Sequence, residues 1–283
     1  MSIRKIQTSL QSVPTVEGAG VHLKRAFGHA QVPQFDPFLM LDDFHSSDPA
    51  DYLAGFPWHP HRGIETITYL LEGVVEHGDS MGNKGVIGAG DVQWMTAGSG
   101  IIHQEMPRES PTGAMWGFQF WANLPAARKM MPPRYQDVKA ADIPDVTLAD
   151  GITVKVIAGT VNGVQGPVRD IIIEPEMLDV SVPPGTVFEH PVPQGHTAFA
   201  YILSGEAAFD ESGRGWRREM VLLFERNGDA IRIETRQEPI RFVLVSGKPL
   251  GEPIAWGGPI VMNTREELHL AFEEYEKGTF IKH

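Results

Sequence analysis

Short runs of β-branched and aromatic residues, each closed by a glycine turn, recur along the chain and constrain its fold more than any other feature. Residues 65–73 read Glu-Thr-Ile-Thr-Tyr-Leu-Leu-Glu-Gly, and residues 199–205 read Phe-Ala-Tyr-Ile-Leu-Ser-Gly. Such residues favour strands, and glycine suits the tight turns between them. The 30 glycines and 22 prolines are spread through the sequence, which suits many short strands better than long helices. The chain is therefore predicted to be all-β, and the two similar runs indicate a weak internal duplication.

The length and one proline-rich stretch predict two domains. At 283 residues the chain is long for one compact core, and its 42% hydrophobic content is ordinary for a globular protein. Pro132-Pro133 and the polar stretch from Gln136 to Pro144 are typical of a linker. We therefore expect one domain in residues 1–135 and a second in residues 136–283.

One helix is expected, and it ends the second domain. Asn263 or Thr264 can cap its first turn, because Glu266 and Glu267 follow at the spacing of a capping box. Gly278 suits the end of such a helix. The face that docks the helix would consist of Leu268, Ala271, Phe272 and Tyr275.

The charge and the missing cysteines exclude several classes of function. The formal net charge is −12 and no dense Lys/Arg cluster occurs, so we expect no direct binding to nucleic acid. No apolar run approaches the roughly 20 residues that span a bilayer, and the first residues lack the apolar part of a secretory signal. We therefore expect a cytoplasmic protein that does not enter a membrane. Because the chain has no cysteine, any metal ion must be held by nitrogen and oxygen atoms.

Two pairs of candidate metal ligands lie far apart in the sequence, at His59-Pro-His61 and at His103-Gln-Glu105. Residues i and i+2 of a strand project from the same face, so two neighbouring strands of a small barrel can direct all four side chains to one interior point. Glu65 has the same strand parity as the first pair and is a further candidate partner. Imidazole and carboxylate groups in this combination suit a divalent first-row metal ion: iron, nickel, copper, manganese or zinc.

The segments around these residues carry a resemblance to a known family. Residues 55–73 read GFPWHPHRGIETITYLLEG, and residues 90–107 read GDVQWMTAGSGIIHQEMP. They resemble the first and second cupin motifs in the form found in the pirin family. Blocks at residues 119–124 and 258–267 are also similar to pirin blocks, so the resemblance runs from about Arg25 to Phe280. It implies a bicupin, which is a pair of antiparallel, jelly-roll-like β-barrels, here with a short C-terminal helix.

In pirins, the resemblance implies a single metal ion in the N-terminal barrel. We expect iron(II), with nickel, copper, manganese or zinc as alternatives. The general cupin pattern would take Glu65 as a ligand, whereas the His-x-Glu spacing of the second pair is the specifically pirin feature. We therefore prefer Glu105 and expect Glu65 to be an acid beside the ligands. The C-terminal barrel is expected to hold no metal ion, with His190 and His196 as surface or loop residues. The implied ligands are His59, His61, His103 and Glu105.

The resemblance implies two kinds of function. Some pirins are quercetin 2,3-dioxygenases, which open a flavonol ring with O₂ and release carbon monoxide, and others are regulators that bind a protein partner in a metal- or redox-dependent way. We expect the enzyme, with Glu105 or Glu65 accepting a proton from the substrate, and keep the non-enzymatic regulator as the alternative. The resemblance also implies a monomer. The expected apolar walls of a pocket for the flat substrate are Phe56, Trp58, Trp94 and Met95.

Overall fold

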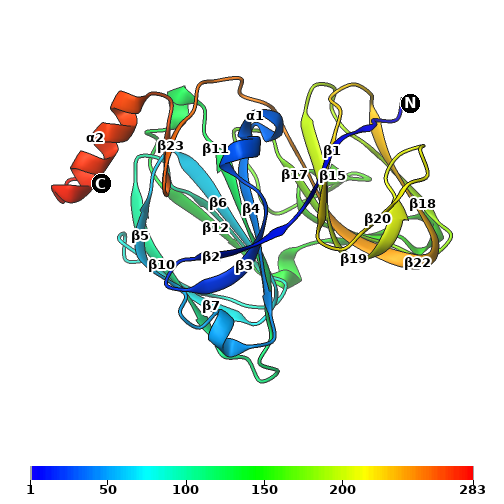
Figure 1. The fold of residues 1–283 in the computed structure, drawn as a ribbon, viewed down its shortest axis with the longest axis horizontal. Helices are drawn as coiled ribbons and strands as arrows, with labels where there is room; N and C mark the ends of the chain where they lie inside the picture. Colours follow the sequence, from blue (N-terminus) through cyan, green and yellow to red (C-terminus); the bar gives the residue numbers. More distant parts are fainter. Residues whose placement is uncertain (1, 283) are drawn as a thin grey trace. The chain divides into compact units, whose positions relative to one another are not determined.

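The computed structural model describes residues 2–282, and antiparallel strands make up most of it (Figure 1). Contacts between residues divide the chain into two compact units. The first unit holds Val13–Val32, Phe38–Ala140 and Leu250–His283, and the second holds Met1–Ser12, Pro33–Pro37 and Ala141–Pro249. The prediction of an all-β fold with a C-terminal helix is confirmed. Within the described residues, no helix is long and apolar enough to span a membrane.

Each end of the chain belongs to the unit that is formed mainly by the other half of the sequence. Strand β1 (Ile6–Gln11) pairs with β21 (Met220–Phe224) in the second unit. The hairpin of β23 (Ala255–Gly257) and β24 (Ile260–Met262) belongs to the first unit. The change of unit after Ala140 lies close to the boundary expected at residue 135, but residues 1–12 and 250–283 are grouped differently from that expectation. The stretch expected to be a linker begins with part of strand β12 (Arg134–Val138), which pairs with β9 (Val92–Thr96), so a polar composition did not distinguish a linker from an edge strand. Composition also carries no information on which distant segment a terminal strand or helix packs against.

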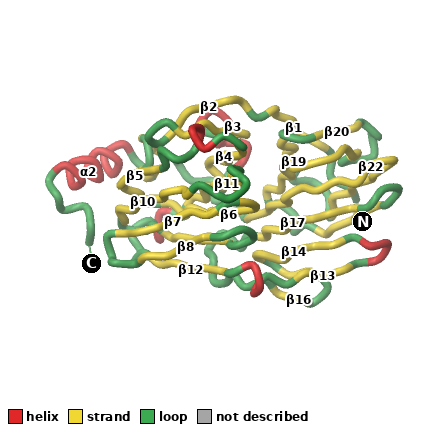
Figure 2. The backbone as a smooth tube through the Cα atoms, turned by 90° about the horizontal axis from the view of Figure 1, so that it is seen from below, coloured by secondary structure: helices red, strands yellow, loops and turns green. Residues whose placement is uncertain are grey.

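Two antiparallel sheets build the first unit (Figure 2). The larger sheet has seven strands in the spatial order β12 (Arg134–Val138), β9 (Val92–Thr96), β6 (Ile64–Glu72), β11 (Met115–Asn123), β4 (Phe38–Ser46), β3 (Val21–Phe27) and β2 (Val13–Glu17). The smaller sheet has four strands in the order β5 (Phe56–His61), β10 (Ile101–Arg108), β7 (Val74–Asp79) and β8 (Lys84–Ile87). The candidate ligands lie on the smaller sheet, whose β5 and β10 are neighbours.

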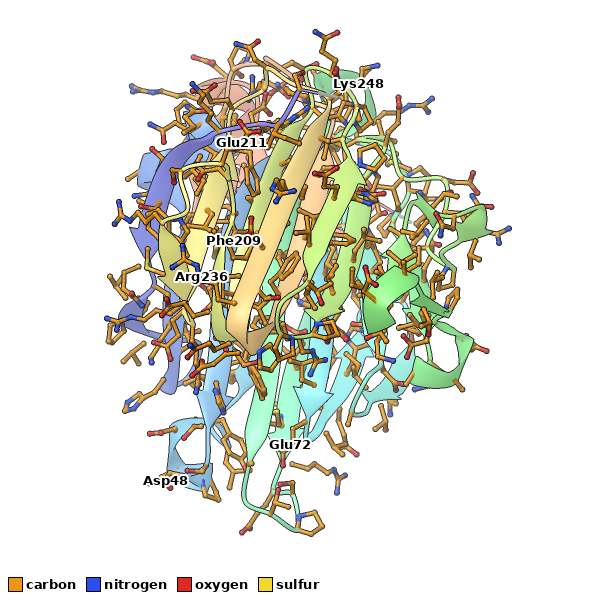
Figure 3. All side chains as sticks on the ribbon, turned by 90° about the vertical axis from the view of Figure 1, so that its right-hand side faces the viewer. Asp48, Glu72, Phe209, Glu211, Arg236 and Lys248 are labelled. Atoms are coloured by element: carbon orange, nitrogen blue, oxygen red, sulfur yellow. The ribbon has the colours of Figure 1, made fainter. Side chains whose placement is uncertain are left out.

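The second unit is built on one nine-stranded sheet. Its path runs through β1, β21, β19 (Thr197–Ala208), β22 (Ala230–Gly247), β17 (Glu176–Val182), β14 (Thr153–Ala158) and β13 (Asp145–Thr147). In addition, β18 (Val187–Pro191) pairs with β22, β20 (Gly215–Arg217) pairs with β19, and β15 (Thr160–Val161) pairs with β16 (Val164–Gln165). Apolar side chains fill the interior, and they include Phe209, which is labelled in Figure 3.

The helices are few and short. Besides α1 (Val32–Phe35) there are single 3₁₀ turns at η1 (His29–Gln31), η2 (Pro49–Asp51), η3 (Ala126–Arg128), η4 (Ala140–Asp142) and η5 (Ala149–Gly151). The C-terminal helix α2 (Arg265–Glu276) has the expected capping box: Thr264 accepts a hydrogen bond from the Glu267 amide, and the Glu267 carboxylate accepts one from the Thr264 amide. Ala271 is buried on its docking face, and Leu268 and Phe272 pack beside it.

Candidate metal centre

The pairing of β5 with β10 brings three imidazoles together. His59 and His61 project from the same face of β5, and the register places His103 of β10 directly opposite His59. The Nε2 atom of His59 lies 3.0 Å from Nε2 of His61 and 3.0 Å from Nε2 of His103. The three donor nitrogens lie within 4.8 Å of one another and form the single group of three or more such donors in residues 2–282. Three of the four predicted ligands therefore converge.

Backbone carbonyls fix the protons of two of these rings. His59 Nδ1 lies 2.8 Å from the carbonyl oxygen of Pro57, and His61 Nδ1 lies 3.0 Å from that of Pro259. A carbonyl can only accept, so each neutral ring carries its proton on Nδ1 and has a lone pair on Nε2. Two lone pairs then face each other across 3.0 Å, an arrangement that repels unless a cation lies between them. Metal-bound histidines have the same outer hydrogen bonds.

Burial keeps the inner imidazoles neutral. Loss of solvent, followed by the neighbouring rings, lowers the pKa of His61 and of His103 well below the usual value for histidine. Neutral imidazole is the form that binds a metal ion, so neither ring has to lose a proton first at pH 7. The donor set therefore fits a divalent first-row ion, for which imidazole is a common ligand.

The fourth predicted ligand, Glu105, lies beside the cluster and outside the group of converging donors. The register of β10 and β5 shifts between His103 and Glu105, so that Glu105 pairs with Phe56 along the strands. Glu105 is buried, and its two oxygens accept hydrogen bonds from Thr68 Oγ1 (3.0 Å) and Gln119 Nε2 (2.8 Å). The side chain borders a small cavity of about 20 Å³, room for about one water molecule. Its role as a ligand remains a prediction.

Glu65 also lies outside the group of converging donors, and its place as an acid beside the ligands remains a prediction. Arg62 and Gly63 form the turn between β5 and β6, and Gly63 has a φ of +77°. The turn places Glu65 in the larger sheet. Counting alternate residues from His61 therefore does not show which way the Glu65 side chain points. The carboxylate is fully buried and accepts hydrogen bonds from Thr96 Oγ1 (2.6 Å) and Trp94 Nε1 (3.1 Å). Burial raises its pKa, and the two donors partly offset that rise.

A fourth histidine near the cluster, the buried His77, was missed by sequence reasoning. His77 of β7 pairs in register with Glu105, and its ring centroid lies 5.4 Å from that of His103 and 5.1 Å from that of Tyr135. Neither ring nitrogen has a hydrogen-bond partner among the described residues, and Nε2 lies 4.0 Å from Asp79 Oδ2. Burial lowers its pKa, against an opposite influence from Glu105 and Asp79. The glycine-rich sequence after His77 predicts a turn, and only its alternation with Val75 and Asp79 could have indicated the strand.

A pocket of about 610 Å³ opens onto His59 and His61. This size is typical of sites for small organic molecules. Part of its wall is polar, because Arg25 donates to Asp42 from Nε (2.8 Å) and from Nη2 (2.7 Å), and Glu17 lies 3.0 Å from the same guanidinium. The apolar part of its wall consists of Met40, Phe56, Pro57, Trp121, Trp256 and Pro259.

Of the four residues predicted to line a pocket, one does so. Phe56 is in the wall, whereas Trp58 points to solvent with 52% of its surface exposed. Trp94 faces Glu65, and Met95 is buried in the cluster with Met40 and Trp121. The sequence argument relied on nearness along the chain to the histidines. Besides β5, the side chains that line the pocket come from β2, β3, β4, β11 and the segment before β24, and no local pattern links these elements to the motifs.

Comparisons with known proteins agree with this geometry. Residues 20–122 match the family model described as Pirin, and residues 177–281 match the model described as Pirin C-terminal cupin domain. A "Pirin-like protein" of Caulobacter vibrioides is 44% identical over 99% of this chain and 100% of its own length. "Pirin" of Homo sapiens is 39% identical over 98% of this chain and 94% of its own. The crystal structure of a quercetin 2,3-dioxygenase from Acinetobacter baumannii matches with a TM-score of 0.90 and 32% identity, covering 99% of each chain.

Proposed function

Because this chain belongs to the pirin family, we propose that it is a metal-dependent dioxygenase that opens a flavonol such as quercetin with O₂. The observation that carries the proposal is the facing pair of imidazole lone pairs at a pocket with apolar walls. The name of the Acinetobacter baumannii structure supports the reaction. Iron(II) is the ion we propose, and nickel, copper, manganese and zinc suit the same donors.

Each residue of the site would have a separate role in this reaction. His59, His61 and His103 would hold the ion, and Glu105 would complete the set or hold the proton that the substrate hydroxyl releases. A bound divalent ion would supply Lewis-acid stabilisation of a deprotonated hydroxyl group. Hydrogen bonds from Thr68 and Gln119 would keep the Glu105 carboxylate in place.

The pocket wall would orient the substrate. Met40, Trp121 and Trp256 offer apolar surface to a flat aromatic ring system. Trp121 stands edge-on to His61, with ring centroids 5.1 Å apart, so a ring packed against it would lie close to the ligand cluster. Because an apolar wall rejects similar molecules only weakly, related flavonols should also be accepted.

The test is quercetin consumption by protein stripped of metal, refilled with iron(II), and carrying either Glu105→Ala or Glu65→Ala. Turnover should stop on removal of metal and return on refilling. Glu105→Ala should lower kcat by about 100-fold or more, the usual range for an acid–base group. Glu65→Ala should keep turnover per folded molecule, because Glu65 contacts Trp94 and Thr96 rather than the ligands.

Equal turnover of quercetin with and without metal would contradict the proposed function. Metal bound normally with quercetin untouched in every sample would favour the alternative function, a regulator that binds a protein partner in a metal-dependent way.

A further inference from the structure

The segment Leu250–His283 returns to the first unit, next to the strand that carries the first two histidines. The backbone of Ile260 bridges to Arg62, and the Val261 amide donates to the Arg62 carbonyl at 3.1 Å. Apolar side chains attach the segment to the unit: a cluster with partly buried Ile102 contains Ile260, Met262, Ala271 and Phe280. The segment therefore packs against the ligand strand over both its hairpin and its helix.

The same segment contacts the ligand cluster directly. The Pro259 carbonyl accepts the hydrogen bond from His61 Nδ1 at 3.0 Å and so determines which nitrogen of that ring has the lone pair. Pro259 also lines the pocket, together with Gly258 and Trp256. A displacement of this loop would free the His61 ring to rotate or to change its tautomer.

Lys129 joins the segment to the turn that follows His61. Its buried ammonium donates to the carbonyls of Gly63 and Val261, each at 2.9 Å, and to Asn123 Oδ1 at 2.7 Å. The contact leaves no room for a side chain at position 63, because a Cβ on Gly63 would lie 2.0 Å from the Val261 carbonyl oxygen. The turn and the segment are therefore closely fitted to each other.

Arg62, the residue after His61, holds the far end of the segment. Its buried guanidinium donates to the carbonyl of Phe280 at 2.8 Å, pairs with Glu274 at 2.7 Å, and lies 4.1 Å from the centroid of the Phe280 ring. Its Nε donates to the Ser99 carbonyl at 2.7 Å, four residues before His103. One side chain thus connects α2 with both strands that carry the imidazoles.

We infer that the C-terminal segment is a clamp that sets the orientation of His61, so that docking of the segment and binding of the metal ion favour each other. This inference rests on the metal binding in the proposed function, and it is independent of the reaction catalysed. Coupling between two binding events is reciprocal, so the metal ion must stabilise the docked segment as much as the docked segment strengthens metal binding.

The first test measures nickel(II) affinity of the untagged, metal-free full chain and of two helix variants. Glu274→Gln removes the ion pairs with Arg62 and with Lys282. Glu273→Gln alters the neighbouring carboxylate, which pairs with His269 and Lys277, both four residues away on α2 or at its C-cap. Glu274→Gln should weaken nickel binding by about 2- to 30-fold, the usual range for a coupled network, and Glu273→Gln should leave it unchanged. Equal affinities in all three proteins would overturn the inference.

The second test uses the unaltered chain, so it does not depend on a variant that folds. Hydrogen exchange is measured with and without nickel(II) on peptides that cover β24 and α2, with β18 of the second unit as the control. Exchange in β24 and α2 should slow on adding nickel, and exchange in β18 should not change. Bound nickel with unchanged exchange in the segment would contradict the clamp alone. A chain that binds no nickel would overturn the clamp and the proposed function together.

Discussion

The two units are built from the same kind of antiparallel strands, and they differ in what fills them. The second unit encloses a continuous apolar cluster that includes Phe188, Phe209 and Phe242. The first unit directs His61, His103 and Glu105 inward and keeps a pocket of about 610 Å³ beside them. Closely packed apolar side chains stabilise a fold but leave no donor and no space for a ligand. The difference indicates that the first unit gives up packing for a binding site.

Buried histidines show the same contrast. In the second unit His190 lies on β18 with Nε2 2.7 Å from the Glu176 carboxylate, so a partner in the chain satisfies it. It was expected on the surface or in a loop, and its burial corrects that expectation. In the first unit, His59 and His61 direct their free nitrogens at each other. A histidine with a carboxylate partner is satisfied within the chain, whereas two facing imidazole nitrogens favour a cation between them.

The two units should differ most in how much stability is lost when one phenylalanine in each is replaced by alanine. Phe242→Ala opens a cavity in a filled core and should lower the free energy of unfolding by about 3–5 kcal/mol. Phe56→Ala only widens an open pocket and should cost about 1 kcal/mol. Urea denaturation of both variants measures this. Equal losses would show that the first unit is packed as tightly as the second.

A smaller effect should come from the way in which each unit holds a positive charge. In the second unit the partly exposed Arg241 donates two hydrogen bonds, of 2.9 Å and 2.6 Å, to the buried carboxylate of Asp179. In the first, Lys129 lies among neutral oxygens, and burial lowers its pKa to about 8 from 10.5. Below pH 8 both the folded and the unfolded chain carry this charge, so the cost of burying it is fully present. Between pH 8 and 10.5 the unfolded chain holds the proton that the folded chain has lost, so this cost declines as the pH rises.

The measurement is the free energy of unfolding of the wild type and of Lys129→Met from pH 7 to pH 10. The free energy of unfolding of the wild type should rise relative to that of Lys129→Met as the pH rises, by up to about 3 kcal/mol. A difference that stays constant, or that shrinks, would mean that the three oxygens stabilise the ammonium enough to cancel its burial.

Local patterns in the sequence predicted much of the fold and the centre of the site. The strand-and-turn composition predicted an all-β chain, and the residues around Thr264 predicted the cap of α2. The i, i+2 spacing predicted that His59 and His61 share a face, and the structure adds the register that places His103 opposite. These features depend on residues close together in the chain, where side-chain periodicity is informative.

The remaining parts depend on contacts between distant segments. Glu65 has the strand parity of the histidines in the sequence, but the turn at Gly63 places it in another sheet. The carbonyl that orients His61 belongs to Pro259, 198 residues further along the chain. Every residue has a backbone carbonyl, so the sequence does not show which one will contact His61. The place of Trp256 in the pocket wall could not be predicted either, because it depends on a contact between segments far apart in the chain.

The most direct test of the central claim is the nickel(II) content of untagged protein after loading and dialysis, in the wild type, His103→Ala and His190→Ala. The account predicts one tightly held ion per chain in the wild type and in His190→Ala, and affinity lower by at least about 100-fold in His103→Ala. Retention of the ion by folded His103→Ala, or its loss from folded His190→Ala, would contradict the assignment of the metal centre to the first unit.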